Sequence, residues 1–214
     1  MTTSTDADAD PVFVDMLTDE ELSVVAPPGA MPVLPFLSDL SERERTTAHR
    51  TAYRSLVARG ILTPPTPESI AEATARRDGS VDVMLRQDIR SVVALRQGAR
   101  LVVAVARTTA AGQDFWYAHL VDDVILLEEV SRDGYHRFAL ARADRVEALA
   151  VAAAVHPDAG DATGESLPVV AEEGDPTPPA EVLERLGEAV VRADVVVRRP
   201  GDSEPPAFAL FTGP

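Results

Sequence analysis

A succession of short apolar runs separated by turn residues occupies the middle of the chain, and no other feature limits the fold as strongly. Between residues 81 and 140 the runs are rich in β-branched or aromatic residues, and pairs such as Asp122-Asp123 and Asp133-Gly134 separate them. Runs of this length and spacing predict an antiparallel meander rather than strands alternating with helices. The six expected strands are Val81–Arg86, Ser91–Arg96, Leu101–Arg107, Phe115–Val121, Val124–Val130 and Tyr135–Leu140.

The pair Asp122-Asp123 predicts a two-residue turn, which fixes the register of the hairpin around it. Alternate residues point to opposite faces of a sheet, so one face of this hairpin is expected to be apolar. The other face carries polar residues, and we expect it to be partly exposed to water. The expected cross-strand pairs are Leu120–Ile125 and Ala118–Leu127 on the first face, and His119–Leu126 and Tyr117–Glu128 on the second.

Helices are predicted on both sides of the meander. Ser41 and Glu44 match a capping box that opens a helix, and Gly60 is a typical stop residue at its end. Thr66, which precedes a proline, opens a second helix that we expect to end near residues 77–79. Beyond the meander the expected elements are helices over 141–155 and 177–192, with Thr177 as the N-cap of the latter, and strands Val195–Arg199 and Ala207–Phe211.

The chain divides into one folded domain and two acidic segments. Residues 1–11 form an acidic tail that is predicted to be disordered. Residues 157–179, with six acidic and no basic residues, are predicted to be a proline-rich loop or linker. The domain comprises residues 12–156, which hold the N-terminal helical pair, the meander and the following helix, and residues 180–214, which complete it. The two segments hold nine acidic and no basic residues, so the remaining residues carry −6 of the net charge of −15.

Two stretches of the chain show the same order of signals. A proline-rich step and a helix lead to Asp82–Arg86, and a second such step and helix lead to Asp194–Arg198. A duplication would explain this pattern, and so would chance, since proline caps and valine-rich strands are common. The predicted fold class is therefore α+β: a central antiparallel meander flanked by two helical pairs, with a pseudo-twofold internal repeat as the consequence of duplication.

No catalytic motif emerges from the sequence. Six residues in the meander could ligate a metal, but they lack metal-site spacing and are more simply explained as turn acids and surface strand charges. Nucleophile elbows and phosphate-binding glycine loops are absent from the sequence. We therefore expect no enzymatic activity, no cofactor and no metal, with a metal-dependent enzyme that uses His119 and His136 as an alternative. The six are His119, Asp122, Asp123, Glu128, Glu129 and His136.

DNA binding is a second alternative. The helix over residues 41–59 carries five arginines, and with the helix that follows it could form a DNA-reading unit over 41–79. Against this, the chain has 20 basic and 35 acidic residues, and contacts to phosphates need a surplus of cations. We therefore expect no nucleic-acid partner.

Three adjacent aromatic residues, Phe115-Trp116-Tyr117, cannot all face one core, because side chains alternate along a strand. Trp and Tyr supply a large contact area at low entropic cost, which suits an interaction anchor. Packing beneath a helix on the second face of the sheet is the plainer explanation. The candidate partner-binding residues are Trp116, Tyr117 and His119.

Composition also bears on location. The first ten residues lack the basic and apolar parts of a secretion signal, and the longest apolar runs are too short to cross a bilayer. No cysteine is present, which is compatible with a reducing compartment. All 20 basic residues are arginine, which is typical of a GC-rich genome such as that of an actinobacterium. We expect a cytoplasmic protein without membrane insertion.

The segment from Leu40 to Leu62, with Leu56-Val57-Ala58-Arg59-Gly60-Ile61, resembles a recurrent segment of one actinobacterial family. In the EspG-like proteins of type VII (ESX) secretion, a helix that ends in such a pattern is followed by a second helix and a meander. The resemblance continues more loosely over Pro67–Arg107. It implies a non-enzymatic cytosolic chaperone, with a central antiparallel sheet and two helical pairs, that holds helical secretion substrates. The family has no invariant chemical motif, so no site residue is transferred.

Overall fold

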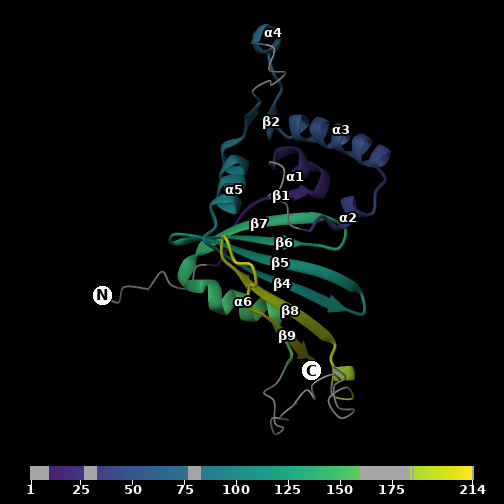
Figure 1. Ribbon diagram of the computed structural model, residues 1–214, viewed down its shortest axis with the longest axis vertical. Coiled ribbons are helices and arrows are strands. Elements are labelled where there is room, and N and C mark those ends of the chain that lie inside the picture. Colours follow the sequence, from purple (N-terminus) through teal and green to yellow (C-terminus); the bar gives the residue numbers. More distant parts are fainter. Residues whose placement is uncertain (1–9, 27–32, 77–82, 160–183, 185, 214) are drawn as a thin grey trace, which may run out of the picture.

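The computed structural model describes residues 10–26, 33–76, 83–159, 184 and 186–213. Its centre is a seven-stranded antiparallel sheet in the order β1-β7-β6-β5-β4-β8-β9 (Figure 1). The predicted α+β class is confirmed. The strands of the sheet are β1 (Val12–Thr18), β4 (Leu101–Thr109), β5 (Gly112–Val121), β6 (Val124–Val130), β7 (Tyr135–Arg142), β8 (Val191–Arg198) and β9 (Ala207–Thr212).

The predicted meander is confirmed for β4 to β7, which are neighbours in chain order. The turn at Asp122-Asp123 is also confirmed. Strand β5 ends at Val121, β6 begins at Val124, and Val121 pairs with Val124. Asp122 has a φ of 49°, the left-handed conformation that aspartate adopts in tight turns. All four cross-strand pairs expected from this turn are present.

Two of the six predicted strands are wrong. Ser91–Arg96 belongs to helix α5 (Gln87–Gly98). In the described part of Val81–Arg86, residues 83–86, the strand is only β3 (Met84–Leu85), which pairs with β2 (Leu62–Thr63) in a small second sheet. The run over α5 contains β-branched residues, but Ile89 and Val92 stand one helical turn apart and both are buried in the core. Burial of this helical stripe outweighs the weak preference of β-branched residues for strands.

The helices before the meander follow the prediction. Helix α3 (Glu42–Ala58) begins with the expected capping box between Ser41 and Glu44, and Gly60 follows it with a φ of +66°. The hydroxyl of Thr66 accepts a hydrogen bond from the Ser69 amide at the start of the second predicted helix. The remaining helices are α1 (Asp19–Val25), α2 (Pro35–Ser38), α4 (Pro67–Arg76) and α6 (Val146–Ala154), the last preceded by the short turn η2 (Ala143–Arg145).

Two predicted boundaries near the C-terminus are wrong. The helix expected over 141–155 begins later, because Ala141 and Arg142 still belong to β7. The helix expected to reach Arg192 ends earlier, because Val191 and Arg192 are the first residues of β8. Neighbouring strands hold these residues in the sheet. Ala141 and Arg142 pair with β6, and Val191 and Arg192 pair with β9. These backbone hydrogen bonds join strands that are distant in the sequence, so the local residue pattern does not reveal them.

The two echoed stretches do not occupy equivalent places. Asp194–Arg198 lies in β8 within the large sheet, whereas the described part of Asp82–Arg86 lies in the two-stranded sheet. A pseudo-twofold repeat of helix and strand would put both strands into the central sheet, so the described strands do not have that symmetry. The predicted tail over 1–11, the linker over 157–179, the helix end near 77–79 and the N-cap at Thr177 lie almost wholly outside the described residues.

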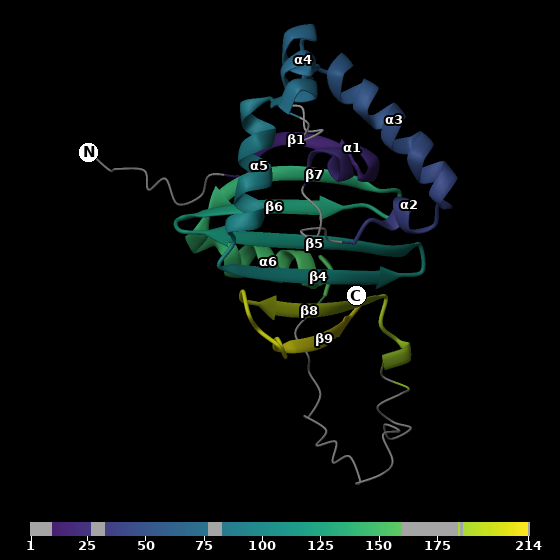
Figure 2. The same cartoon turned by 45° about the horizontal axis from the view of Figure 1, so that its top comes forward.

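Helices cover both faces of the sheet (Figures 1 and 2). On one face α6 packs over β4, β5 and β8, around a core that includes Val105, Trp116 and Ile125. On the other face α1 and α5 lie over the strands, α3 packs on α1, and the core includes Leu22, Leu126 and Phe138. The second face was expected to be partly wet, and that expectation is wrong because these helices bury it. No described helix has the length and hydrophobicity needed to cross a membrane.

We predict that Gly134→Ala destabilises the fold more than Gly60→Ala. Both glycines have positive φ, so alanine costs about 1–2 kcal/mol of backbone strain at either site. A Cβ on Gly134 would also lie 2.8 Å from the Phe36 Cβ and 2.9 Å from the Asp19 Cγ, whereas one on Gly60 meets nothing within 4 Å. Crowding adds about 1–3 kcal/mol at Gly134 alone. Urea denaturation of both variants measures the difference, and equal losses would contradict the prediction.

Candidate functional site

Five charged or titratable side chains meet in the interior between the sheet and helices α1 and α5. Glu128 on β6 is at their centre and is fully buried. Its Oε1 lies 2.7 Å from Nδ1 of His136, and its Oε2 lies 3.0 Å from Nε2 of His119. The Nε of Arg96, from α5, is also 3.0 Å from Oε2. Both oxygens of this carboxylate therefore have cationic or hydrogen-bonding partners.

Asp19 extends this network to the helices. It is the first residue of α1, and its Oδ1 lies 2.8 Å from Nε2 of His136. Its Oδ2 accepts hydrogen bonds from the backbone amides of Phe36 (2.8 Å) and Leu37 (3.0 Å) in α2. The His136 ring thus bridges two buried carboxylates, and Asp19 ties α1, α2 and β7 together. We call these five residues, Asp19, Arg96, His119, Glu128 and His136, the buried ionic network.

The surroundings shift the pKa values of the two central groups in opposite directions. Burial alone would raise the pKa of Glu128, but hydrogen bonds from His119 and His136 and the charge of Arg96 hold it well below its usual range. Burial alone would lower the pKa of His136, but its hydrogen bonds to Asp19 and Glu128 and their charges raise it. The network therefore favours an ionised Glu128 beside a protonated His136.

The network is closed to substrates. Asp19, Glu128 and His136 have no exposed surface, and their side-chain polar atoms bond to other members of the network or to the backbone. Two atoms of the network, Nδ1 of His119 and Nε of Arg96, are buried without a hydrogen-bond partner among the described groups, although Arg96 Nε forms an ion pair with Glu128. This arrangement holds α1, α5 and the sheet together through buried polar contacts.

The structure separates the six residues considered as metal ligands. His119, Glu128 and His136 come together, but as hydrogen-bonded partners in the interior rather than as the expected surface charges. Asp122 and Asp123 form the β5–β6 turn, and Glu129 faces away to pair with Arg137 at 3.1 Å. Within the described residues no three His, Asp or Glu side chains are grouped to hold a metal ion.

Two of the three candidate partner-binding residues are buried. Trp116 is 5% exposed and packs in the α6-side core, and His119 belongs to the buried ionic network. Tyr117 is partly buried on the opposite face from Trp116, stacked against His119 with ring centroids 6.0 Å apart. Burial raises the pKa of Tyr117 to about 12, and the charge of Glu128 adds to the shift. Their packing matches the plainer explanation, a second face covered by helices.

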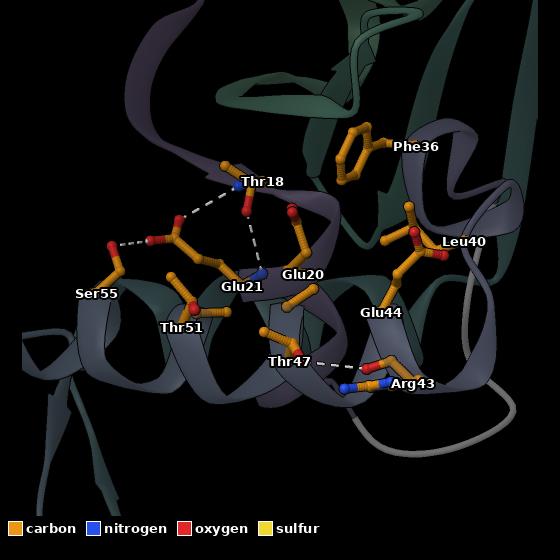
Figure 3. A pocket seen from close by; sticks show the side chains of 12 residues that line it. Thr18, Glu20, Glu21, Phe36, Leu40, Arg43, Glu44, Thr47, Thr51 and Ser55 are labelled. Atoms are coloured by element: carbon orange, nitrogen blue, oxygen red, sulfur yellow. Dashed lines mark hydrogen bonds between the residues drawn. The ribbon is translucent and has the colours of Figure 1, made fainter.

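A solvent-open groove of about 550 Å³ lies between α1, α2 and the face of α3 that runs from Arg43 to Ser55 (Figure 3). The α3 wall presents small side chains one helical turn apart, and Phe36 and Leu40 form the apolar part of the opposite wall. We call it the helix groove. Its lining residues are Thr18, Glu20, Glu21, Phe36, Leu40, Arg43, Glu44, Thr47, Ala48, Thr51, Ala52 and Ser55.

Glu21 fixes the spacing of the groove walls. Its Oε1 accepts a hydrogen bond from the hydroxyl of Ser55 on α3 (2.7 Å), and its Oε2 pairs with Arg59 at 2.6 Å. It also completes a capping box with Thr18 at the start of α1. The neighbouring carboxylate of Glu20 has no partner among the described residues and lies on the groove (Figure 3).

Sequence reasoning missed Asp19 and Glu21. Thr18-Asp19-Glu20-Glu21 matches the capping-box pattern of a helix start, which was the available signal. Comparisons with known proteins add no assignment, because no family model and no curated protein matches this chain. The geometry alone therefore has to support a function.

We predict that the free energy of unfolding is greatest in a mildly acidic window. The lowered pKa of Glu128 stabilises the fold above its usual value of 4.5, and this contribution is lost as pH falls through the folded-state pKa. The raised pKa of His136 stabilises the fold below its usual value of 6.5, and this contribution is lost as pH rises through the folded-state pKa. Urea denaturation across this range measures the curve.

The matched variants are His136→Gln and His156→Gln. The first removes the imidazolium from the buried ionic network and is expected to flatten the decline at higher pH. His156 lies outside that network, where its Nδ1 accepts a hydrogen bond from the Asp158 amide, so its variant keeps the decline. A stability that does not fall above the usual pKa of histidine would contradict the proposed role of His136.

Proposed function

We propose that the chain is a non-enzymatic protein-binding module, a cytosolic chaperone or adaptor of the EspG-like kind for helical type VII secretion substrates. The observation that carries the proposal is the helix groove, which is open to solvent and mainly apolar. Its charged residues, Glu20, Glu21, Arg43 and Glu44, lie among these apolar surfaces. An apolar centre with polar groups around it is the usual composition of a protein-binding surface.

The α3 wall of the groove suits a helical partner. Thr47, Ala48 and Thr51 are small and lie on one face of α3, so they leave room for larger side chains from another molecule. An amphipathic helix places its apolar residues three and four positions apart and can insert them into such a groove. Phe36, which is 44% exposed, is an aromatic contact on the facing wall. The proposed partner is therefore a helix with an apolar face.

The chemistry of the interior supports a role without catalysis. Within the described residues, Asp19, His119, Glu128 and His136 are engaged with one another in the buried ionic network, and none of the four lines the helix groove. A metal-dependent enzyme that uses His119 and His136 would need both imidazoles free to bind an ion, and each is already bonded to Glu128. The groove has the charge and shape of a docking surface instead.

We predict that Thr51→Trp abolishes capture of a helical partner and Thr46→Trp does not. Both threonines are exposed on α3, but Thr51 lines the helix groove and Thr46 does not. An indole at position 51 fills the space that a partner's side chains need, and neither variant disturbs the core. Pull-down from the native host followed by mass spectrometry measures the capture. Equal recovery by the two variants would reject the groove, and recovery of no helical protein by the wild type would reject the function.

DNA binding through residues 41–79 is the alternative, because Arg45, Arg50 and Arg54 are exposed on α3. Within the described residues none of the three pairs with a carboxylate. A mobility-shift assay on genomic fragments at low salt separates the two functions, since phosphate contacts make retention strongly salt-dependent. Under the protein-binding proposal we expect no retention, and retention that Arg50→Ala and Arg54→Ala weaken would favour DNA binding.

A further inference from the structure

The two edges of the large sheet differ in how their backbone groups are satisfied. Among the described strands β1 pairs with β7 alone, and side chains occupy several of its outward backbone groups. The carbonyl of Met16 accepts a hydrogen bond from Nη2 of Arg59 (2.9 Å), and its amide donates to Oδ1 of Asp15 (2.7 Å). The amide of Thr18 donates to Oε2 of Glu21 (3.3 Å). A register shift between Phe13 and Asp15 interrupts this edge further. These features are typical of an edge protected against pairing.

Strand β9 forms the opposite edge and lacks this protection. The carbonyls of Pro206 and Thr212 accept hydrogen bonds from the amides of Val197 and Val190, so they point toward β8. Backbone groups alternate in direction along a strand. The amides and carbonyls of Ala207, Ala209 and Phe211 therefore point away from β8. In the described part of the chain, no side chain or backbone group bonds to these six.

The side chains of β9 favour association. Ala207–Thr212 contains no charged residue. Phe208 is 55% exposed on the α6 side of the sheet, and Phe211 is 40% exposed on the other side, where Arg192 lies 5.7 Å from its ring centroid. Arg192 is itself paired with Asp194 at 2.9 Å, which leaves little net charge beside the strand. An uncharged apolar edge with free backbone groups is a template for another strand.

We propose that β9 pairs antiparallel with β9 of a second copy of this chain, about a twofold axis at Ala209, so that the two large sheets become continuous. The twofold places Ala209 opposite Ala209 of the partner subunit, where both outward amides and carbonyls can bond. Phe211 then faces Ala207 of the partner subunit, and Phe208 faces Leu210 of the partner subunit. Each face of the sheet gains apolar pairs, with a large side chain against a smaller one on the Phe211 side.

A second copy of the chain fits this edge because β9 carries no charge and can pair with an identical strand. Isologous pairing brings identical surfaces together, so any charge on the strand would meet a like charge. β9 carries none, whereas β1 carries Asp15 and is contacted by Arg59 and Arg86. The helix groove lies at the β1 end of the molecule, beside α1, and stays open in such a dimer (Figure 2).

Sedimentation equilibrium on the full chain tests the proposal with Ala209→Pro and Ala209→Val. Proline removes the outward amide of residue 209 and places its ring on the open edge, a position where strands tolerate proline. Valine keeps the amide and is the matched control. We expect the wild type and the valine variant to dimerise at micromolar concentration, and the proline variant to raise the dissociation constant about tenfold or more. Phe211→Lys, which leaves the backbone intact, should weaken the dimer similarly.

A wild-type chain that remains monomeric at about millimolar concentration would overturn the proposal. So would a dimer whose dissociation constant is the same in the wild type, Ala209→Pro and Phe211→Lys, because that dimer uses another surface. Circular dichroism melts of the monomeric variants confirm that they are folded. Thr51→Trp leaves the dimer unchanged, so failure here and failure of the helix groove give different results.

Discussion

The carboxylate of Glu128 is the constraint on which the architecture depends, because a charge without exposed surface has to be compensated by its neighbours. His119 and His136 lie on β5 and β7, the two strands that flank β6, and Arg96 belongs to α5. Together they fix the helix-covered face of the sheet and the position of α5 upon it. Apolar contacts alone would stabilise the same layers, but they would accept small shifts that directional hydrogen bonds do not.

Asp19 connects the buried ionic network to the helices at the surface. Its contact with His136 places the first turn of α1 against the sheet, and its bonds to two α2 amides hold that short helix in place. Glu21, two residues later, then sets the distance to α3 through Ser55 and Arg59. The helix groove is therefore built on a rigid series of polar contacts that begins in the core. A docking surface that is fixed before binding loses less entropy when a partner arrives.

Local signals in the sequence predicted a large part of the fold. The hairpin register at Asp122-Asp123 and both helix starts at Ser41 and Thr66 follow from turn and capping chemistry within a few residues. Helix α5 was mistaken for a strand because β-branched residues within it match both patterns, and burial against β5 and β6 decides between them. The buried ionic network could not be predicted, since Asp19 and His136 are 117 residues apart in the chain.

The sequence by itself determined the α+β class, the central meander and the alternation that places His119 and Glu128 on one face, because these depend on neighbouring residues and the pleat of a strand. Only the tertiary structure decided that α1 and α5 cover this face, that its polar side chains are buried rather than wet, and that α1, α2 and α3 enclose a groove. The difference between the two edges of the sheet was likewise decided by the tertiary structure alone. Which backbone groups remain open depends on strand order, and strand order is set by contacts between distant segments.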